Sequence, residues 1–387
     1  MNNVENNKNI LIVGGAGFIG SNLALKLLSK NFNVRVLDNL SKQIHGENPE
    51  TSALYQSIKN KIDFIIGDIR EQNIWDNVLE NIDIIVHLAA ETGTGQSMYE
   101  IYRYTDVNIS GTAGLLDYIT NKKHSVKKII VASSRAIYGE GKYRCNKHGI
   151  VYPLTREDKD MAKGDFEVKC PICNEDVSIL PTDEESKIHP TSVYGITKQV
   201  QEELVLVCCK ALGIPAISFR YQNVYGPGQS LKNPYTGILS IFSTCLINNK
   251  TINIFEDGKE SRDFVFIDDV VNATIKGIES EISDCMTVNV GTGIPINVLT
   301  VAETLRNLYN SQSEINISGN YRIGDIRNNI ADITVLEEKL NYKPIVSFEE
   351  GIKIFVEWVK LQSPIMDTNN YYEKSIKEMQ NKGLFKC

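Results

Sequence analysis

The chain has 387 residues, of which 42% are hydrophobic and 23% charged, and its formal net charge is -7. This length and composition predict a globular protein with one large α/β domain and a smaller appended lobe. The acidic balance and the scattered Lys and Arg residues argue against a nucleic-acid partner, and no apolar run approaches the roughly 20 residues that span a bilayer. The polar start, Met1 to Lys8, lacks the features of a secretory signal, so we expect a cytoplasmic protein without a membrane partner.

Short β-branched runs alternate with helical patterns from Asn9 onward. The strand-like runs are Ile10–Val13, Asn33–Leu37, Asp63–Ile66, Ile82–His87, Lys128–Ala132 and Pro215–Arg220, and the first helical pattern is Phe18–Leu28. Such alternation predicts a parallel sheet with helices on both faces. The fold class we expect is therefore α/β, with a Rossmann-like doubly wound sheet.

A glycine-rich turn follows the first predicted strand. It reads Gly14-Gly15-Ala16-Gly17-Phe18-Ile19-Gly20, with three of its glycines at intervals of three residues, and a helix begins within it. Such glycines allow a tight turn and a close approach of the backbone to a pyrophosphate at the helix N-terminus. We expect a dinucleotide here, and we include Phe18 and Ile19 in its site.

The second predicted strand ends at Asp38, about twenty residues after the glycines, where a carboxylate accepts hydrogen bonds from both hydroxyls of an adenosine ribose. A 2′-phosphate would meet Asp38 as a like charge, and the basic residues Arg35 and Lys42 are not adjacent to it. We therefore expect NAD rather than NADP, with Asn39 in the same site. The alternative is that Asp38 is only a solvent-exposed acidic residue of a loop and binds no ligand.

Two more strand ends carry residues expected at this site. Asp68 and Ile69 follow the third apolar run, and Leu88, Ala89 and Ala90 follow the fourth. Open α/β sheets bind ligands at the carboxyl ends of their strands. The small alanines would leave room for the pyrophosphate and ribose.

Tyr194 and Lys198 are four residues apart, so on a helix they share one face. An ammonium near a phenol favours the phenolate and lowers the pKa of the phenol toward the range of a general base. Ser134 follows a predicted strand, and its hydroxyl can bond the same substrate oxygen. The spacing of the tyrosine and lysine is common by itself, so the upstream serine is needed for the prediction of proton transfer at a hydroxyl.

In this order, the motifs resemble those of extended short-chain dehydrogenases/reductases, over residues 8 to 358 apart from one insertion. The resemblance implies that Tyr194 is the base, that Lys198 anchors the nicotinamide ribose and that Ser134 is the hydroxyl partner. It also places Asn108 at the cofactor site, as a structural residue rather than a catalyst.

The same resemblance implies a nucleotide-activated sugar as substrate. The segment Arg220–Pro227 is similar to the family's Arg-x-x-Asn-x-Tyr-Gly-Pro, whose asparagine, here Asn223, contacts the substrate diphosphate. Arg262 and Arg327 occupy places where these enzymes put arginines on the diphosphate. Guanidinium groups suit phosphate geometry.

Family dehydratases carry Asp-Glu after the catalytic hydroxyl, whereas this chain has Arg135 and Ala136. Without those carboxyl groups the elimination lacks its acid and base, so we expect a 4-epimerase. It would oxidise C4, let the keto-sugar turn and return the hydride to the opposite face, with Arg135 contacting the substrate. Open alternatives are a nucleotide-sugar reductase or 4,6-dehydratase and, of another class, a non-catalytic NAD-binding regulatory protein.

A finer resemblance comes from Ala90–Ser97, from Ser134–Gly141 and from the Cys/His insertion that follows. These segments are similar to the epimerase subgroup that interconverts dTDP-L-rhamnose and dTDP-6-deoxy-L-talose. The resemblance places Thr94 in the sugar pocket. The alternative is a glycine-rich loop without specific contacts.

The insertion contains Cys145-x-x-His148 and Cys170-x-x-Cys173. Two pairs with two-residue spacers can hold a tetrahedral zinc, which would stabilise a polar segment with little core. We expect a structural zinc without a part in hydride chemistry. Unligated thiols remain an alternative, as does a Cys170–Cys173 disulfide, which a reducing compartment disfavours.

These predictions divide the chain into segments. An NAD-binding domain covers 8–220, and 265–292 returns to it; an insertion covers 141–180; a substrate-binding lobe covers 221–264 and 293–360; a tail covers 361–387. The sequence indicates no role for the tail. Family members usually dimerise through a helix bundle, so the resemblance implies a homodimer.

Overall fold

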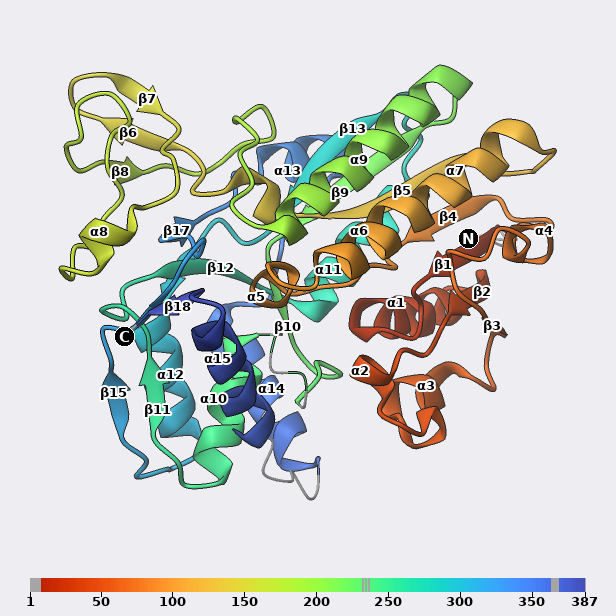
Figure 1. Cartoon of the computed structure of the whole chain (residues 1–387). Helices are drawn as coiled ribbons and strands as arrows, with labels where there is room; N and C mark the ends of the chain where they lie inside the picture. Colours follow the sequence, from red (N-terminus) through yellow and green to blue (C-terminus); the bar gives the residue numbers. More distant parts are fainter. Residues whose placement is uncertain (1–7, 232, 234, 236, 363–368, 387) are drawn as a thin grey trace.

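The computed structural model describes residues 8–231, 233, 235, 237–362 and 369–386, and its centre is a seven-stranded parallel sheet (Figure 1). From edge to edge the strands are β13 (Met286–Val290), β9 (Ala216–Tyr221), β5 (Lys128–Ser134), β4 (Ile84–His87), β1 (Asn9–Val13), β2 (Asn33–Asp38) and β3 (Asp63–Ile66). The chain winds outward in both directions from the adjacent strands β1 and β4. The predicted Rossmann-like doubly wound sheet is confirmed, and β1 and β4 form its switch point, where such sheets bind ligands.

Helices cover both faces of this sheet. On one face α1 (Phe18–Ser29) packs against α11 (Ile267–Glu279), and on the other α7 (Gly111–Asn121) packs against α9 (Val193–Leu212). Along β1, Ile10 and Ile12 enter the core of the first face, while Leu11 and Val13 enter that of the second. Because successive strand residues point to opposite faces, a strand between two helical layers must be apolar throughout.

A smaller lobe is built around β12 (Ser261–Phe266). Its partners in one sheet are β10 (Asn223–Tyr225), β14 (Pro295–Asn297) and β17 (Asn328–Asn329). Two further strand pairs are β11 (Ile252–Ile254) with β15 (Ile315–Ile317), and β16 (Tyr321–Arg322) with β18 (Phe385–Lys386). The longer helices of this lobe are α10 (Ile238–Ile247), α12 (Val298–Leu308), α14 (Phe348–Lys360) and α15 (Asn369–Asn381).

The insertion contains a three-stranded sheet of its own, in the order β7 (Gly149–Val151), β6 (Tyr143–Cys145) and β8 (Ser178–Ile179), and one short helix, α8 (Asp158–Met161). Strands of two or three residues are too short to show an alternating pattern, which explains why the sequence indicated no strands here. Its buried apolar cluster is small and consists of Tyr143, Cys145, Val151, Val168 and Cys170.

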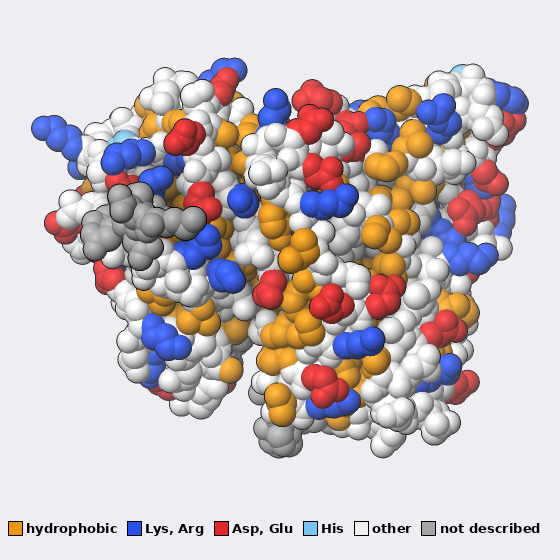
Figure 2. Space-filling model, turned by 180° about the vertical axis from the view of Figure 1, so that it is seen from behind, with side chains coloured by type: hydrophobic (Ala, Val, Ile, Leu, Met, Phe, Trp, Pro, Cys, Tyr) orange, Lys and Arg blue, Asp and Glu red, His pale blue; other side chains and the backbone are white. Residues whose placement is uncertain are grey.

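The remaining helices are short: α2 (Lys42–His45), α3 (Ala53–Ile58), α4 (Ile74–Val78), α5 (Thr94–Ser97), α6 (Ile101–Thr105) and α13 (Thr334–Leu340). In the part of the chain that the structure describes, no helix is long and apolar enough to cross a membrane. Figure 2 shows Lys and Arg interspersed with Asp and Glu over the back face of the molecule.

Candidate active site

The turn after β1 is shaped by its glycines. Gly14 has a φ of +80°, and a Cβ atom there would lie 2.6 Å from the backbone nitrogen of Ala89. A Cβ on Gly20 would lie 2.6 Å from the carbonyl oxygen of Gly14. Only glycine fits both places. Gly17 precedes α1 and has no side chain that could cap the helix. The first turn of α1 lines the cavity, so its N–H groups can bind an anion there.

Asp38, at the end of β2, is held beside this turn. One carboxylate oxygen accepts from Ala16 N–H at 2.9 Å and the other from Leu40 N–H at 2.8 Å. Burial raises the pKa of Asp38, while the two N–H groups and nearby His45 act in the opposite direction. The carboxylate is thus fixed at the place where the adenosine ribose is expected.

One cavity of about 560 Å³ joins the strand ends to the smaller lobe. Its lining includes most of the predicted site residues: Gly14, Gly17, Phe18, Ile19, Gly20, Asp38, Asn39, Asp68, Ile69, Leu88, Ala89, Ala90, Thr94, Ser134, Arg135, Tyr194, Lys198, Asn223 and Arg262. Segments far apart in the sequence therefore meet at one elongated site.

Asn108 lies behind the cavity wall rather than in its lining. Its amide nitrogen donates to the Glu91 carbonyl at 3.1 Å and to Thr197 Oγ1 at 3.0 Å, and its oxygen accepts from Glu91 N–H at 2.7 Å. It ties the loop after Ala90 to helix α9. This arrangement is that of a structural residue.

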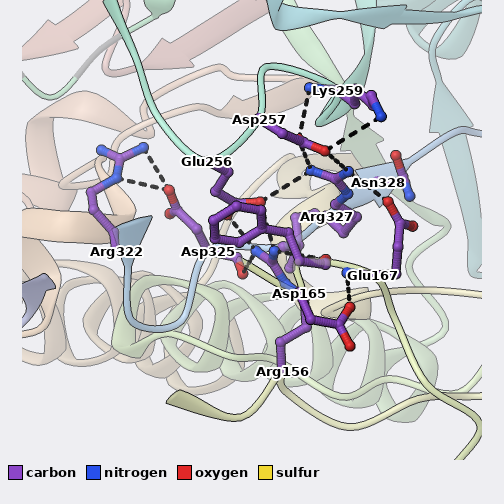
Figure 3. Close-up of polar contacts among 12 residues, drawn as sticks. Arg156, Asp165, Glu167, Glu256, Asp257, Lys259, Arg322, Asp325, Arg327 and Asn328 are labelled. Atoms are coloured by element: carbon purple, nitrogen blue, oxygen red, sulfur yellow. Dashed lines mark hydrogen bonds and ion pairs between the residues drawn. The ribbon is translucent and has the colours of Figure 1, made fainter. Parts of the chain in front are cut away.

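Arg327 is not brought into the cavity either. Its buried guanidinium pairs with Glu256 at 3.2 Å, Asp257 at 2.6 Å and Glu167 at 2.7 Å, and Figure 3 shows it enclosed among these acids. Three carboxylates already occupy its donors, so it has no free face for a diphosphate. The arginine that lines the cavity in this region is Arg322, which pairs with Asp325 at 2.7 Å.

Sequence reasoning missed Arg322 because it took the arginine after Gly324-Asp325 instead of the one before it. The local signal, Arg322-x-Gly324-Asp325, was present. Only the path of the chain after β16 decides which of the two side chains faces the cavity.

Helix α9 positions the tyrosine and lysine. It begins at Val193, where the Ser192 hydroxyl accepts from Gly195 N–H at 3.1 Å, and Tyr194 N–H donates to Ser97 Oγ at 3.0 Å. The Lys198 ammonium donates to Gln201. Burial lowers the pKa of Lys198 to about 7.

The expectation for the tyrosine was that Lys198 lowers its pKa. Instead, burial raises the pKa of Tyr194, and the groups that act against burial are the Ser134 hydroxyl and the charge of Arg135. The Lys198 ammonium faces Gln201, which explains why it does not appear among those groups. In this arrangement of side chains, Ser134 and Arg135 rather than Lys198 oppose the effect of burial, and the action of Lys198 on the tyrosine stays a prediction.

A group of arginines lines the same cavity. Arg135 donates to Asn223 Oδ1 at 2.7 Å, and Arg262 donates to the carbonyls of Ile326 and Arg327 at 2.7 and 2.9 Å. Burial, and next the positive charge of Arg262, lower the pKa of Arg135 to about 9. A bound anion would relieve this repulsion, so the arrangement suits a diphosphate.

Several buried polar atoms in the lining have no hydrogen-bond partner within the described part of the chain: Ser133 Oγ, both amide atoms of Gln222, Gln229 Oε1 and Glu260 Oε2. Buried polar groups are normally paired. These atoms therefore fit a ligand with several polar groups, as a nucleotide and a sugar have. Gln222 lies inside the Arg220–Pro227 motif, whereas no sequence signal pointed to Gln229 or Glu260.

The four predicted metal ligands of the insertion come together. One ligand atom from each of Cys145, His148, Cys170 and Cys173 lies within 4.8 Å of the others. Cys145 Sγ is 3.5 Å from His148 Nδ1 and 3.7 Å from Cys173 Sγ. All three cysteines are free thiols, so the disulfide alternative does not describe this structure.

Comparison with known proteins agrees with this geometry. The sequence model of the NAD dependent epimerase/dehydratase family matches residues 10–156 and 172–291. The chain belongs to this family. Within it, the chain is 37% identical to a dTDP-L-rhamnose 4-epimerase of Burkholderia thailandensis, over 91% of this chain and 95% of that one. It is 31% identical to a putative UDP-glucose 4-epimerase of Methanocaldococcus jannaschii, over 91% and 98%.

Solved structures of epimerases have the same fold. The UDP-glucose 4-epimerase of Thermotoga maritima, solved with UDP-glucose, matches with a TM-score of 0.74 and 30% identity, covering 91% of this chain and 98% of its own. The UDP-glucuronic acid 4-epimerase of Bacillus cereus, solved with UDP-glucuronic acid and NAD, matches with a TM-score of 0.72 and 25% identity, covering 91% and 99%.

Proposed function

We propose that this member of the epimerase/dehydratase family is an NAD-dependent nucleotide-sugar 4-epimerase that interconverts dTDP-L-rhamnose and dTDP-6-deoxy-L-talose. The observation that carries the proposal is one cavity that is lined both by Ser134 and Tyr194 and by the arginines Arg135, Arg262 and Arg322. The 37% identity to a dTDP-L-rhamnose 4-epimerase supports the choice of substrate.

The residues present fit NAD. The glycine turn admits a backbone-bound pyrophosphate, and Asp38 is fixed for the ribose hydroxyls in a position that disfavours a 2′-phosphate. When bound, NAD supplies the acceptor and later the donor of the C4 hydride. Lys198 would hold the nicotinamide ribose.

The protein's own groups would manage the proton and the sugar. Tyr194 Oη takes the proton of the C4 hydroxyl during oxidation and returns it during reduction, while Ser134 Oγ holds the same oxygen. Arg135, Arg262 and Arg322 hold the diphosphate, which leaves the keto-sugar free to turn about its link to the nucleotide. Hydride return to the other face then gives the C4 epimer.

A dehydratase fits the lining less well. The two positions after Ser134 hold Arg135 and Ala136, which cannot serve as the acid and base of an elimination. The carboxylate of Glu91 lines the cavity but is paired with Arg103 at 2.7 Å. An epimerase needs no such carboxyl pair.

The reaction can be tested directly. We expect the purified protein, incubated with dTDP-L-rhamnose in deuterated water without added reductant, to produce the 6-deoxy-talose isomer with protium retained at C4, as measured by proton NMR. In a parallel incubation to which NADH is added, stoichiometric oxidation of the NADH would instead indicate a reductase. Deuterium at C3 or C5 would instead indicate enolisation of a 4-keto sugar and a different mechanism, and absence of change with dTDP-L-rhamnose would remove this substrate.

We propose further that the Cys/His cluster holds a structural zinc, since its donor set is that of closed zinc sites. We expect metal analysis of the purified protein to give about one zinc per chain, and Cys170→Ser to lose it and lower the melting temperature. The control Cys208→Ser, outside the cluster, should keep the metal. A metal-free wild-type protein with an unchanged melting temperature after chelation would contradict the proposal.

A homodimer remains a proposal. Exposed apolar side chains lie on the adjacent helices α6 and α9: Ile101 is 54% exposed, Tyr102 82% and Val207 68%. A second copy could cover them in a helix bundle.

A further inference from the structure

The tail after α14 returns to the smaller lobe and is attached beside Arg322. Its last strand, β18, pairs antiparallel with β16, so that Phe385 lies opposite Arg322. Ile323 N–H donates to the Leu384 carbonyl at 3.0 Å. The ring of Phe385 packs edge-on against Phe255, with centroids 5.0 Å apart. The end of the tail is thus joined to the strand that carries a cavity arginine.

Helix α15 also contacts the loop that lines the sugar end of the cavity. The hydroxyls of Tyr99 and Tyr235 are 2.6 Å apart, and they donate to the Glu378 carboxylate at 3.2 and 3.4 Å. The Lys382 ammonium lies 5.1 Å from the centre of the Tyr99 ring. Glu378 and Lys382 therefore hold Tyr99 from two sides.

Tyr99 lies just beyond α5, and this short helix belongs to the catalytic region. Thr94 at its start lines the cavity, and Ser97 at its end accepts the hydrogen bond of Tyr194 N–H. A displacement of Tyr99 would consequently reach both the sugar pocket and the start of the catalytic helix.

Tyr372, in the first turns of α15, lines the cavity together with Phe255, Glu260 and Arg322. It also borders a second cavity of about 230 Å³ between α10, β11 and α15. Its side chain is thus part of the wall between the two cavities, and its phenol can donate a hydrogen bond to an anionic or hydroxylated ligand beside Arg322.

We propose that the C-terminal segment, residues 369–386, is part of the substrate site: Tyr372 contacts the nucleotide portion of the ligand, and Glu378 is a positioning residue that holds the loop Thr94–Tyr99 through Tyr99. The inference deepens the proposed function, since it rests on a nucleotide sugar as ligand. It does not depend on which sugar is turned over.

The contact of Tyr372 is tested by titrating full-length, NAD-loaded protein with dTDP and with UDP in a calorimeter. We expect Tyr372→Ala to weaken binding of both by about tenfold or more, and Tyr372→Phe by less, because only a hydrogen bond is lost. The matched control is Lys377→Ala, an exposed position on the same helix. Wild-type affinity in Tyr372→Ala, at unchanged melting temperature and NAD content, would overturn the assignment.

The role of Glu378 is tested by comparing Glu378→Ala with Glu378→Gln. The amide of glutamine can still accept from Tyr99, so we expect it to restore what alanine loses. Alanine should lower kcat by about tenfold, leave the dTDP affinity unchanged and increase hydrogen exchange in residues 94–99. Equal behaviour of the two variants, or unchanged exchange in both, would refute the positioning role.

The two proposals fail in different ways. If no nucleotide sugar is turned over while dTDP still binds in a Tyr372-dependent manner, the 4-epimerase proposal fails and the tail retains its role. If dTDP-L-rhamnose is epimerised normally by Tyr372→Ala and Glu378→Ala, the tail has no role and the function stands.

Discussion

Replacement of Tyr194 by Phe should lower kcat on the nucleotide sugar by on the order of 10²–10⁴-fold. The hydroxyl is the only group removed, and it is the one expected to move the C4 proton beside Ser134. The aromatic ring and the α9 helix remain, so the fold and the bound NAD should be unaffected. The measurement is the initial rate, together with the NAD released on denaturation.

The control for this variant is Tyr102→Phe, which removes the hydroxyl of a tyrosine that is 82% exposed. Its rate should equal that of the wild type. If Tyr194→Phe retained full turnover, another group would be the base. If the protein showed no turnover of any nucleotide sugar yet bound NAD, the non-catalytic class would be favoured.

The second large effect is expected for two arginine variants, of which one should lose affinity for dTDP and the other should lose folding stability. Arg322→Ala removes a cavity guanidinium and leaves Asp325 unpaired near the anion, so dTDP binding should weaken by about 1.5–3 kcal/mol, roughly 10- to 150-fold, with little change in stability. Arg327→Ala leaves buried Glu256 with fewer positive partners, so it should destabilise the fold by about 3–5 kcal/mol.

Both variants are measured by denaturant unfolding and by calorimetry with dTDP on the folded protein. Folded Arg327→Ala should still bind dTDP, because its guanidinium faces Glu256, Asp257 and Glu167 rather than the cavity. A large loss of affinity in Arg327→Ala without a loss of stability would restore the sequence-based assignment of this residue to the diphosphate.

The ionic cluster around Arg327 links three parts of the chain that the sequence does not connect (Figure 3). Arg156, from the insertion, binds Glu256 through two bonds of 2.7 and 2.8 Å and donates to the carbonyl of Asp325 at 2.8 Å. The insertion therefore supports the loop that carries Asp325 at the cavity wall. This contact links the insertion, where we propose a zinc site, to the wall of the cavity.

The sequence by itself determined the features that depend on local patterns. The apolar runs defined a parallel sheet, because strands buried on both faces must be apolar throughout. The glycine turn and Asp38 predicted a dinucleotide site, because both stand at strand ends. The spacing of Tyr194 and Lys198 predicted that both lie on one helix, and the spacing of the Cys/His pairs predicted a cluster of four ligand atoms.

The tertiary structure alone decided what depends on contacts between distant segments. It distinguished Arg322 from Arg327, because only the path of the chain determines which guanidinium is enclosed by several acids and which lines the cavity. It showed that burial raises the pKa of Tyr194 and that the Lys198 ammonium donates to Gln201, because burial and side-chain direction are not local properties. It brought Tyr372 to the cavity lining and Glu378 to Tyr99, because these contacts join the end of the chain to segments far away in the sequence.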